Sequence, residues 1–450
     1  MSDQSLARTA APLMVSFTLR FLFTFVDMAF AARLEEQEAS VAAIGYYAPF
    51  AAITIAVWVG TSAGFTAALS AAFGARDETR IAALKRSLLG ILAVLIPVVV
   101  ACGAGVWLVA PHLGLEQPLM EAFRVYGTTV MVGMSLTGFW AIYPDSIIKA
   151  HQDMRSTMIA GLLSTGTNVV LNALFVFVFS WGLFGIALAT VVSRLPSLIY
   201  AIARAAKLEG RRDGAAWPAP APQAWPSPAR TIAMLAVPGA LTHLLQASEY
   251  AVINRLLTDL PDSTRAIASW GVFERMLSLS IMPAVAASVA VVPWVALRLP
   301  RGETARIRRE LRSTTLAIVG VSVTLTVVMG WLFAEPLAGF FLRGDGDTAG
   351  PGPLVLGALA LLPLGTLGIA PFMMLRPVFE AALRPRLGIY VSVLRYVVFS
   401  LPLLFIGREL APRAGLTGLQ GIALGLATAG LLAAIAVIGL AHRTLHAKPA

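Results

Sequence analysis

Seven long stretches of this 450-residue chain contain no Asp, Glu, Lys or Arg. They are 39–75, 87–114, 156–193, 276–297, 313–334, 348–375 and 414–441. A membrane-spanning helix needs about 20 consecutive apolar residues to cross a hydrocarbon core about 30 Å thick, and each stretch is long enough. Soluble domains are about 25% charged, whereas this chain is 13% charged and 58% hydrophobic. The sequence therefore excludes a water-soluble fold.

Apolar segments that carry one or two charges bring the number of predicted transmembrane helices to twelve. The predicted ranges are 9–33, 42–72, 86–110, 122–147, 156–179, 183–205, 231–257, 265–297, 312–334, 351–379, 387–407 and 415–441. Residues 29–31 resemble the small-residue cleavage site of a signal peptide. However, Arg20 and Asp27 interrupt the apolar region before it, so we interpret this range as the first transmembrane span. The predicted fold class is an all-α polytopic membrane protein.

The basic residues lie mainly in alternate connections between the predicted helices. These connections hold Arg76, Arg80, Lys85, Arg86, Lys149, Arg155, Lys207, Arg211, Arg212, Arg230, the arginines of 298–312, Arg384 and Arg386. The opposite connections carry mainly acids, such as Glu35, Glu36, Glu116 and Asp259. The positive-inside rule places the basic connections and both termini in the cytoplasm. The net charge of +10 is therefore interpreted as a signal of membrane orientation and not of nucleic-acid binding.

A Pro- and Ala-rich segment, 209–230, is predicted to be an extended cytoplasmic linker between an N-terminal bundle, 1–208, and a C-terminal bundle, 231–450. The sequences of the two bundles match at an offset of 226 residues, which aligns Pro12 with Pro238. Six helices in each half make the repeats parallel, so we expect a pseudo-two-fold axis along the membrane normal. Such a fold gives alternating access to a site between its bundles.

Four polar side chains are predicted to lie in the first bundle at a similar depth. Asp27 lies about nine residues before the middle of the first outer connection, and Asn172 and Thr190 lie about eight or nine residues on either side of the third. Asn168 is one helical turn from Asn172 on the same face. Their oxygens can bind a hard cation such as Na⁺, or the carboxylate can hold an exchangeable proton. The alternative is that the Asn and Thr side chains only join helices.

Further ionisable groups lie within the predicted spans. Glu249 lies about twelve residues before the middle of the 258–264 turn, and Glu274 and Arg275 lie about thirteen after it. Equal depth predicts a Glu249–Arg275 ion pair, which is either structural or part of a second coupling or substrate site. Arg20 lies seven residues before Asp27, on nearly the same helix face, so it is predicted to influence the carboxylate or to contact substrate.

An enzyme is the remote alternative. Residues 60–64 match G-x-S-x-G around Ser62, and His243 is the only histidine in a predicted span. That motif needs a strand-to-helix turn, whereas this segment lies in a long apolar helix, which favours small-residue helix packing. The single Cys102 excludes a disulfide framework, and the sequence has no Walker motif. We predict neither an intramembrane serine protease nor a resident cofactor.

The chain resembles the MATE (multidrug and toxic compound extrusion) transporters, within a superfamily that includes polysaccharide and lipid-oligosaccharide flippases. The resemblance is strongest at Pro12 and Val26-Asp27, 41–45, 74–77, 168–172 and 185–193. It implies that Asp27, Asn168, Asn172 and Thr190 form a coupling site and that the first helix bends near Pro12. One branch of the family has an Asp at the position of Asn172. Another branch has a Glu at the position of Gln246, and here the nearest carboxylate is Glu249, one turn further on.

The sequence predicts a monomeric secondary antiporter in a bacterial inner membrane. It would export amphipathic, cationic organic compounds against inward H⁺ or Na⁺, with membrane lipid as its other partner. The alternative is a flippase for a phosphate-linked lipid or oligosaccharide lipid, because arginines suit phosphates and the spans contain Arg20, Arg194, Arg275 and Arg395. Arginines that pair with Glu249 and Glu274 would favour the antiporter, and arginines that face a cavity would favour the flippase.

Overall fold

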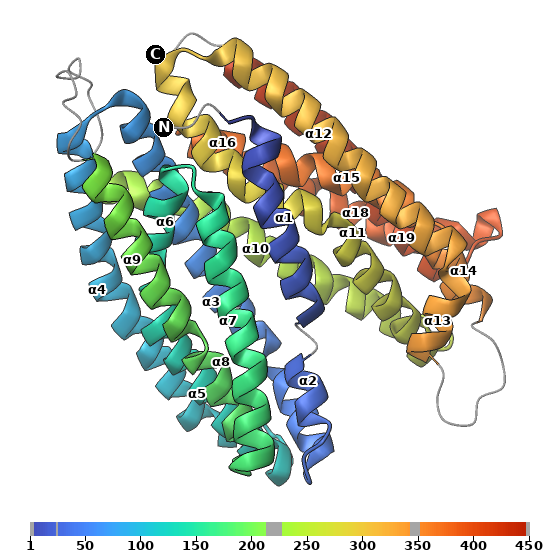
Figure 1. Ribbon diagram of the computed structural model, residues 1–450. Helices are drawn as coiled ribbons and strands as arrows, with labels where there is room; N and C mark the ends of the chain where they lie inside the picture. The colour runs from blue at the N-terminus through green and yellow to red at the C-terminus, as the bar shows by residue number, and fades with distance from the viewer. Residues whose placement is uncertain (1–3, 24–25, 213–226, 343–351, 447–450) are drawn as a thin grey trace. The chain divides into compact units, whose positions relative to one another are not determined.

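The computed structural model describes residues 4–23, 26–212, 227–342 and 352–446, apart from a few side chains within them, among them that of Arg20 (Figure 1). These residues form helices joined by short connections, and no strand occurs among them. Ten of the described helices are long and apolar enough to cross a membrane, and α5 and α6, bent by 45° at a short break, make an eleventh if counted as one span. The predicted all-α, multi-pass membrane fold is confirmed.

The helices of the first half follow the predicted spans closely. In chain order they are α1 (Leu6–Phe23), α2 (Val26–Ala31), α3 (Gln37–Ala75), α4 (Glu78–Val109), η1 (Ala110–His112), α5 (Gln117–Gly138), α6 (Ile142–Ala150), α7 (Met154–Ala173), η2 (Leu174–Val178), α8 (Gly182–Val192) and α9 (Arg194–Arg212). The predicted first span, 9–33, corresponds to α1 and α2, and residues 24–25 between them lie outside the described residues.

The second half repeats this arrangement of long helices with short interruptions. Its elements are α10 (Pro228–Thr258), α11 (Ser263–Arg298), η3 (Leu299–Arg301), α12 (Thr304–Val327), η4 (Val328–Leu332), α13 (Ala334–Leu342), α14 (Pro353–Leu359), α15 (Leu362–Leu375), α16 (Val378–Ala381), α17 (Pro385–Val393), η5 (Leu394–Ser400), α18 (Leu401–Leu410), η6 (Ala411–Ala414) and α19 (Gly418–His446).

The chain divides into two compact units. The N unit contains Met1–Gln4, Ala11–Ala240 and Ala296–Arg301, and the C unit contains Ser5–Ala10, Leu241–Val295 and Gly302–Ala450. The predicted linker, 209–230, falls mostly on 213–226, which lie outside the described residues. Its two ends are helical rather than extended, because α9 continues to Arg212 and α10 begins at Pro228.

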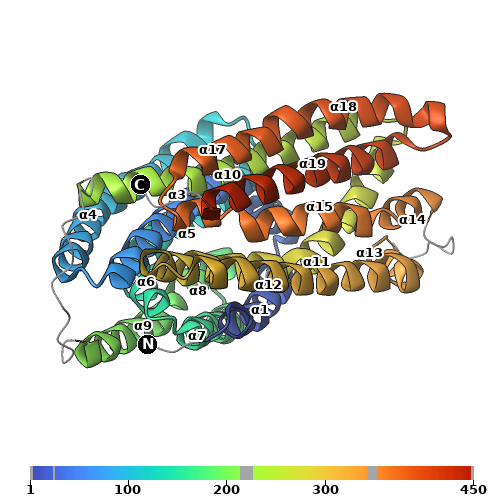
Figure 2. The same ribbon diagram turned by 90° about the horizontal axis from the view of Figure 1, so that it is seen from above.

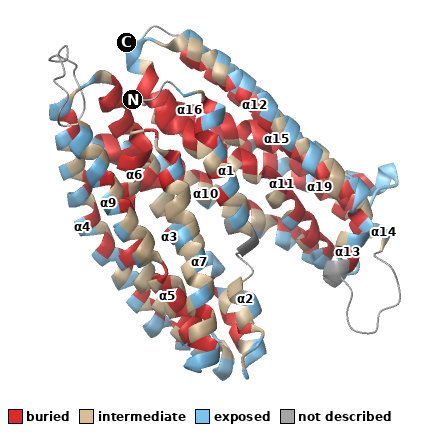
Figure 3. Ribbon diagram, in the orientation of Figure 1, coloured by how far each residue is buried: buried red, intermediate tan, exposed pale blue. Residues whose placement is uncertain are grey.

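The helices carry the apolar surface that a bilayer requires. In α4 the buried positions recur every three or four residues, as in Leu84, Leu88 and Leu92, and therefore form one stripe. The opposite face stays apolar, with Val94 68% and Val98 53% exposed. Figure 3 shows buried and exposed residues alternating along α4 in this way. A helix that exposes valine to its surroundings is suited to lipid rather than to water.

Small residues let helix backbones approach closely within each unit. In the N unit, a Cβ added at Gly60 would lie 2.5 Å from the carbonyl oxygen of Ala236 on α10. In the C unit α15 packs against both α12 and α19, and it lies between them in Figure 2. A Cβ added at Gly368 of α15 would lie 2.4 Å from the backbone of Gly430 on α19. These contacts have the small-residue geometry of packed transmembrane helices.

Candidate functional site

The four polar residues predicted at one depth form a hydrogen-bonded group in the N unit. α2 carries Asp27, α7 carries Asn168 and Asn172 on one face, and α8 carries Thr190. Asn172 Nδ2 donates to Asp27 Oδ1 at 2.7 Å and to Asn168 Oδ1 at 3.3 Å. Asn168 Nδ2 donates to Thr190 Oγ1 at 3.5 Å. The structure therefore brings all four side chains together.

The hydroxyl of Thr190 has a choice of two acceptors. It lies 3.2 Å from Asp27 Oδ2 and 3.1 Å from the carbonyl oxygen of Ile186, one turn earlier on α8. A hydroxyl has one proton to donate, so it bonds one of these acceptors at a time. The Thr190 bond to Asp27 can therefore be exchanged for a bond within α8.

One buried atom of the group has no partner. Asn172 is fully buried, and its Oδ1 accepts no hydrogen bond from the described residues. A buried acceptor without a donor costs about 1–3 kcal/mol, so such an atom needs an explanation. A cation can coordinate this oxygen. A protonated Asp27 can also donate to it if the amide turns over, because amide oxygen and nitrogen exchange places on rotation.

The carboxylate of Asp27 is half-buried, and its hydrogen-bond partners among the described residues are neutral. Its hydrogen bonds come from Asn172 and Thr190, and none of the described basic side chains forms an ion pair with it. The phenol of Tyr126 on α5, which is buried, lies within electrostatic range of this carboxylate. A carboxylate surrounded by neutral oxygens and amides keeps its charge available for a proton or for a hard cation.

In the C unit, Glu249 pairs with a residue that the sequence analysis did not assign to it. Arg395 Nη1 donates to Glu249 Oε1 at 2.8 Å, and the hydroxyl of Ser400 bonds the same oxygen. Both charged side chains are buried, at 4% and 3% exposure. The predicted Glu249–Arg275 pair is therefore wrong, because Arg395 on η5 reaches the carboxylate from a helix far along the chain, while the side chain of Arg275 is exposed.

A small cavity adjoins this pair. It has a volume of about 20 Å³, and its walls include Gln246, Glu249, Glu274 and Arg395. A volume of about 10–15 Å³ or more can hold a water molecule. Gln246 Nε2 donates weakly to the hydroxyl of Tyr250, at 3.4 Å. The structure thus gathers three of the predicted C-terminal residues around one cavity, and Arg275 does not line it.

Two predicted residues lie in α1. The helix continues from Leu6 to Phe23 through Pro12, although proline cannot donate the backbone hydrogen bond of an ordinary helical residue. The backbone of Arg20 is helical, and its side chain lies outside the described part of the structure. The bend near Pro12 and the role of Arg20 therefore stay predictions.

Ser62 lies in the middle of the continuous helix α3 and is buried. A nucleophile elbow requires a strand-to-helix turn, which this segment is not. A Cβ added at Gly64 would lie 2.7 Å from the backbone nitrogen of Ala236. The glycines around Ser62 therefore serve close packing of α3 on α10.

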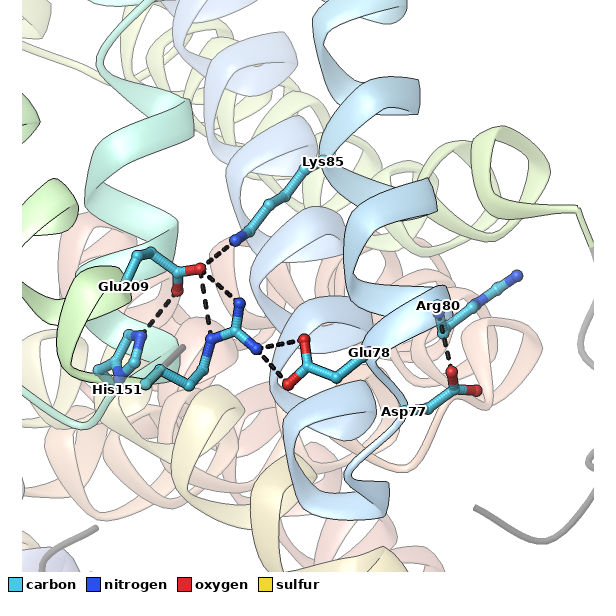
Figure 4. A network of polar contacts seen from close by, with 7 residues as sticks. Asp77, Glu78, Arg80, Lys85, His151 and Glu209 are labelled. Carbon is cyan, nitrogen blue, oxygen red and sulfur yellow. Dashed lines mark hydrogen bonds and ion pairs between the residues drawn. The ribbon is translucent and has the colours of Figure 1, made fainter. Parts of the chain in front are cut away.

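A second polar cluster joins three helices at the end of the N unit where α9 stops (Figure 4). His151 Nε2 lies 2.8 Å from Glu209 Oε1, and Arg212 Nη2 donates to Glu209 Oε2 at 2.8 Å. Lys85 bonds the same carboxylate, and Glu78 bonds Arg212. We call these five residues the Glu209 cluster. The sequence indicates only a role in orientation for Lys85 and Arg212, and it does not predict the contacts within this cluster.

The family and structural relatives agree with this architecture. The MatE family model matches residues 12–174 and 238–406. These two segments begin at Pro12 and Pro238, the prolines that the internal repeat pairs.

Three relatives cover nearly the whole chain. An FAD transporter from Shewanella oneidensis is 25% identical over 448 residues, which cover 94% of this chain and 90% of that protein. A MOP superfamily transporter from Pyrococcus furiosus has a TM-score of 0.83 at 17% identity, with 98% and 96% of the two chains covered. A multidrug resistance MATE family transporter in an outward-facing conformation has a TM-score of 0.84 at 18% identity, with 98% and 95% covered. At these identities the two solved structures show a shared fold.

The family match extends over most of the chain, and members of this family are transporters rather than enzymes. The apolar helices, the paired halves and the polar group around Asp27 all fit such a protein. The chain belongs to the MatE family of multi-pass membrane transporters.

Proposed function

We propose that this protein is a secondary antiporter that exports amphipathic, cationic organic compounds in exchange for inward H⁺ or Na⁺. The observation that carries the proposal is the environment of Asp27. Neutral donors hold this carboxylate, and next to it the buried Oδ1 of Asn172 has no partner among the described residues. A proton or a hard cation at this position would use both features.

Coupling would work by a difference in affinity between two conformations. A coupling ion on Asp27 would favour the conformation in which Asn172 Oδ1 also binds, and it would weaken substrate binding. A ligand shifts such an equilibrium only by its differential affinity for the two states. The exchangeable bond of Thr190, between Asp27 and Ile186, supplies an alternative arrangement of the same groups.

The ion pair in the C unit supports the antiporter over a lipid flippase. Arg395 is one of the intramembrane arginines that suit a phosphate, but its guanidinium bonds the carboxylate of Glu249 and is buried. An arginine neutralised in this way is not available as a phosphate ligand. The placement of both termini in the cytoplasm of a bacterial inner membrane, and a monomeric state, belong to the same proposal.

A second candidate substrate comes from one relative. The Shewanella oneidensis protein, 25% identical over 94% of this chain, is an FAD transporter. A flavin dinucleotide is aromatic and carries phosphates, so its transport would need cationic groups other than Arg395. FAD therefore belongs in the same transport assay as a cationic dye.

The test is transport by the purified full chain in proteoliposomes. Efflux of a cationic dye and of FAD would be followed separately under a pH gradient and under a Na⁺ gradient. We expect one gradient to drive dye transport, and Asp27→Asn to abolish the driven component. Asp259→Asn is the matched control, because Asp259 is an exposed aspartate near the end of α10. Driven transport that survives in Asp27→Asn would refute the coupling role, and driven transport of FAD alone would replace the cationic substrate.

A further inference from the structure

A large pocket opens at one end of the N unit, away from the Glu209 cluster. Its volume is about 790 Å³. Its walls come from the α2–α3 connection, the last turn of α4, the first turns of α5 and the α7–α8 connection. The connections after α2, α4 and α7 lie at the lower end of the N unit in Figure 1. These are the connections that the positive-inside rule places on the outer side of the membrane. We call it the arginine pocket after Arg33 and Arg124, which both line it.

Charges of both signs line the arginine pocket without neutralising one another. The cations are Arg33 and Arg124, and the anions are Glu35, Glu36 and Glu121. None of these five side chains forms an ion pair with a described residue. Side chains of opposite charge that share a pocket but stay unpaired can each bind one end of a ligand that carries both charges.

Arg124 is held in place, yet it keeps a free donor. Its guanidinium carbon lies 3.8 Å from the centroid of the Trp107 ring, which is a cation–π contact. Its Nε is buried and donates to no described acceptor. A planar guanidinium fixed on an indole presents its N–H groups in a set direction, which suits a phosphate.

The pocket has an aromatic rim. Trp107 and Phe177 line it and are 41% and 59% exposed, and Phe179 and Trp181 follow Phe177 and are exposed as well. Aromatic side chains are enriched where a membrane protein meets the headgroup region. The rim therefore places the pocket at the level of lipid headgroups, with exposed apolar surface beside it for acyl chains.

We propose that the arginine pocket binds the headgroup of a zwitterionic phospholipid of the phosphoethanolamine type. Arg124 and Arg33 would hold the phosphate, and Glu35, Glu36 and Glu121 would accept hydrogen bonds from the primary ammonium. The acyl chains would lie along Val176 and Phe177. The volume falls within the range of about 300–1,000 Å³ that is usual for small-ligand pockets.

The position of Arg33 links this pocket to the α2 segment. Arg33 lies six residues after Asp27, in the connection from α2 to α3, whereas Arg124 lies on α5. One phosphate bound by both arginines would join that connection to α5. The bound lipid would then restrict movement of the segment that carries Asp27.

The test measures lipid binding to the purified, delipidated full chain by native mass spectrometry. Phosphatidylethanolamine, phosphatidylglycerol and phosphatidylcholine with identical acyl chains would be compared, and glycerophosphoethanolamine would be used as a competitor. We expect phosphatidylethanolamine to bind about tenfold more tightly than the other two lipids, because only its headgroup offers both a phosphate and hydrogen-bonding ammonium protons. The chain-free competitor should displace it only weakly.

Two substitutions test the phosphate and the ammonium contacts of the headgroup separately. Arg124→Gln should weaken phosphatidylethanolamine binding about tenfold, since a charge-assisted hydrogen bond is lost. Glu36→Gln, a surface change that leaves the arginines intact, should instead shift preference toward phosphatidylglycerol. Arg265→Gln is the control, because Arg265 is an exposed arginine in the C unit. A matching unfolding temperature would establish that each variant is folded.

Three results would overturn the proposal. One is equal binding of the zwitterionic and the anionic lipid. Another is unchanged lipid binding in both Arg124→Gln and Glu36→Gln. The third is displacement by glycerophosphoethanolamine at the same concentration as the lipid itself, which would assign the pocket to a soluble phosphate ester. None of these outcomes depends on antiport activity, so this proposal and the proposed function can fail separately.

Discussion

Asn172 Nδ2 donates a hydrogen bond to Asp27 Oδ1 at 2.7 Å, while the buried Oδ1 of Asn172 accepts no bond from the described residues. One residue therefore contributes a satisfied donor and an unsatisfied acceptor to the same site. A substitution at Asn172 can remove the donor or change the acceptor of this carboxamide. Asn172 is therefore the most informative position to change.

Asn172→Asp should strengthen cation binding. A second carboxylate in contact with Asp27 raises the negative charge of the oxygen set, and more ligand charge increases affinity for hard cations. We expect Na⁺ to bind at least about tenfold more tightly, measured by calorimetry on the purified protein. Asn254→Asp places a new carboxylate at an exposed position of α10 and should leave Na⁺ affinity unchanged. Equal affinities in the two variants would count against an ion site at Asn172.

Thr190→Val should reduce coupling without removing it. The variant loses the hydroxyl that lies 3.2 Å from Asp27 and that accepts from Asn168. A hydrogen bond to a charged group is worth about 1.5–3 kcal/mol, which corresponds to about tenfold or more in the concentration of coupling ion at half-maximal transport. Thr190→Ser keeps the hydroxyl and should behave as wild type. An equal loss in the serine variant would mean that the methyl group, and not the bond, is what matters.

Glu249→Gln should destabilise the protein strongly. The change leaves the guanidinium of Arg395 buried without its carboxylate, and breaking a buried ion pair on one side costs about 3–5 kcal/mol. Adding Arg395→Met to the same chain should recover part of this loss, because the unpaired charge is then gone. Thermal unfolding in detergent would show both effects. A double variant that unfolds at the temperature of the single one would show that Arg395 is not the source of the cost.

Glu209→Gln should loosen the end of α9. The carboxylate bonds His151, Lys85 and Arg212. The neutral amide of glutamine would leave the positive charge of these basic side chains without a negative partner. We expect a loss of about 1–3 kcal/mol and faster hydrogen exchange at the C-terminal turns of α9. Glu303→Gln, which breaks a local pair with Arg306 in the C unit, should leave exchange in α9 unchanged. Unaltered exchange in Glu209→Gln would show that α9 does not depend on the cluster.

Gly64→Ala should separate α3 from α10. The new methyl group would meet the backbone of Ile232 and Ala236 at 2.7 Å, and overpacking of this kind costs about 1–3 kcal/mol. Gly90→Ala on α4 meets nothing within 4 Å and should be neutral or slightly stabilising. The difference in unfolding temperature between these variants measures how closely the two helices pack. Equal temperatures would contradict the close contact.

The sequence predicted the helices and the membership of the Asp27 group well, because both follow from helix geometry. Every predicted range contains helix in the structure. Counting residues from a connection gives depth in a membrane, and this depth predicted Asp27, Asn172 and Thr190 as neighbours. Helix periodicity added Asn168, and the structure joins all four by hydrogen bonds.

Contacts between helices that are distant in the chain could not be predicted from the sequence. Glu249 and Arg395 are 146 positions apart, and depth counting compared only the two helices of one hairpin. The rotation of a helix about its axis decides which side chain meets which, and an apolar helix exposed to lipid has weak periodicity to reveal that rotation. For the same reason the arginine pocket was not predicted, since its charges come from the α2–α3 connection and from the distant helix α5.

The bonds of Asp27 have a consequence for how an ion would act on the first bundle. The described residues of α2, Val26–Ala31, contact α3, α7 and α8. Through Asp27, α2 is also bonded to Asn172 on α7 and to Thr190 on α8. Under the proposed coupling, a proton or cation on Asp27 would change both of these bonds at once. One ion would then act on the packing of three helices.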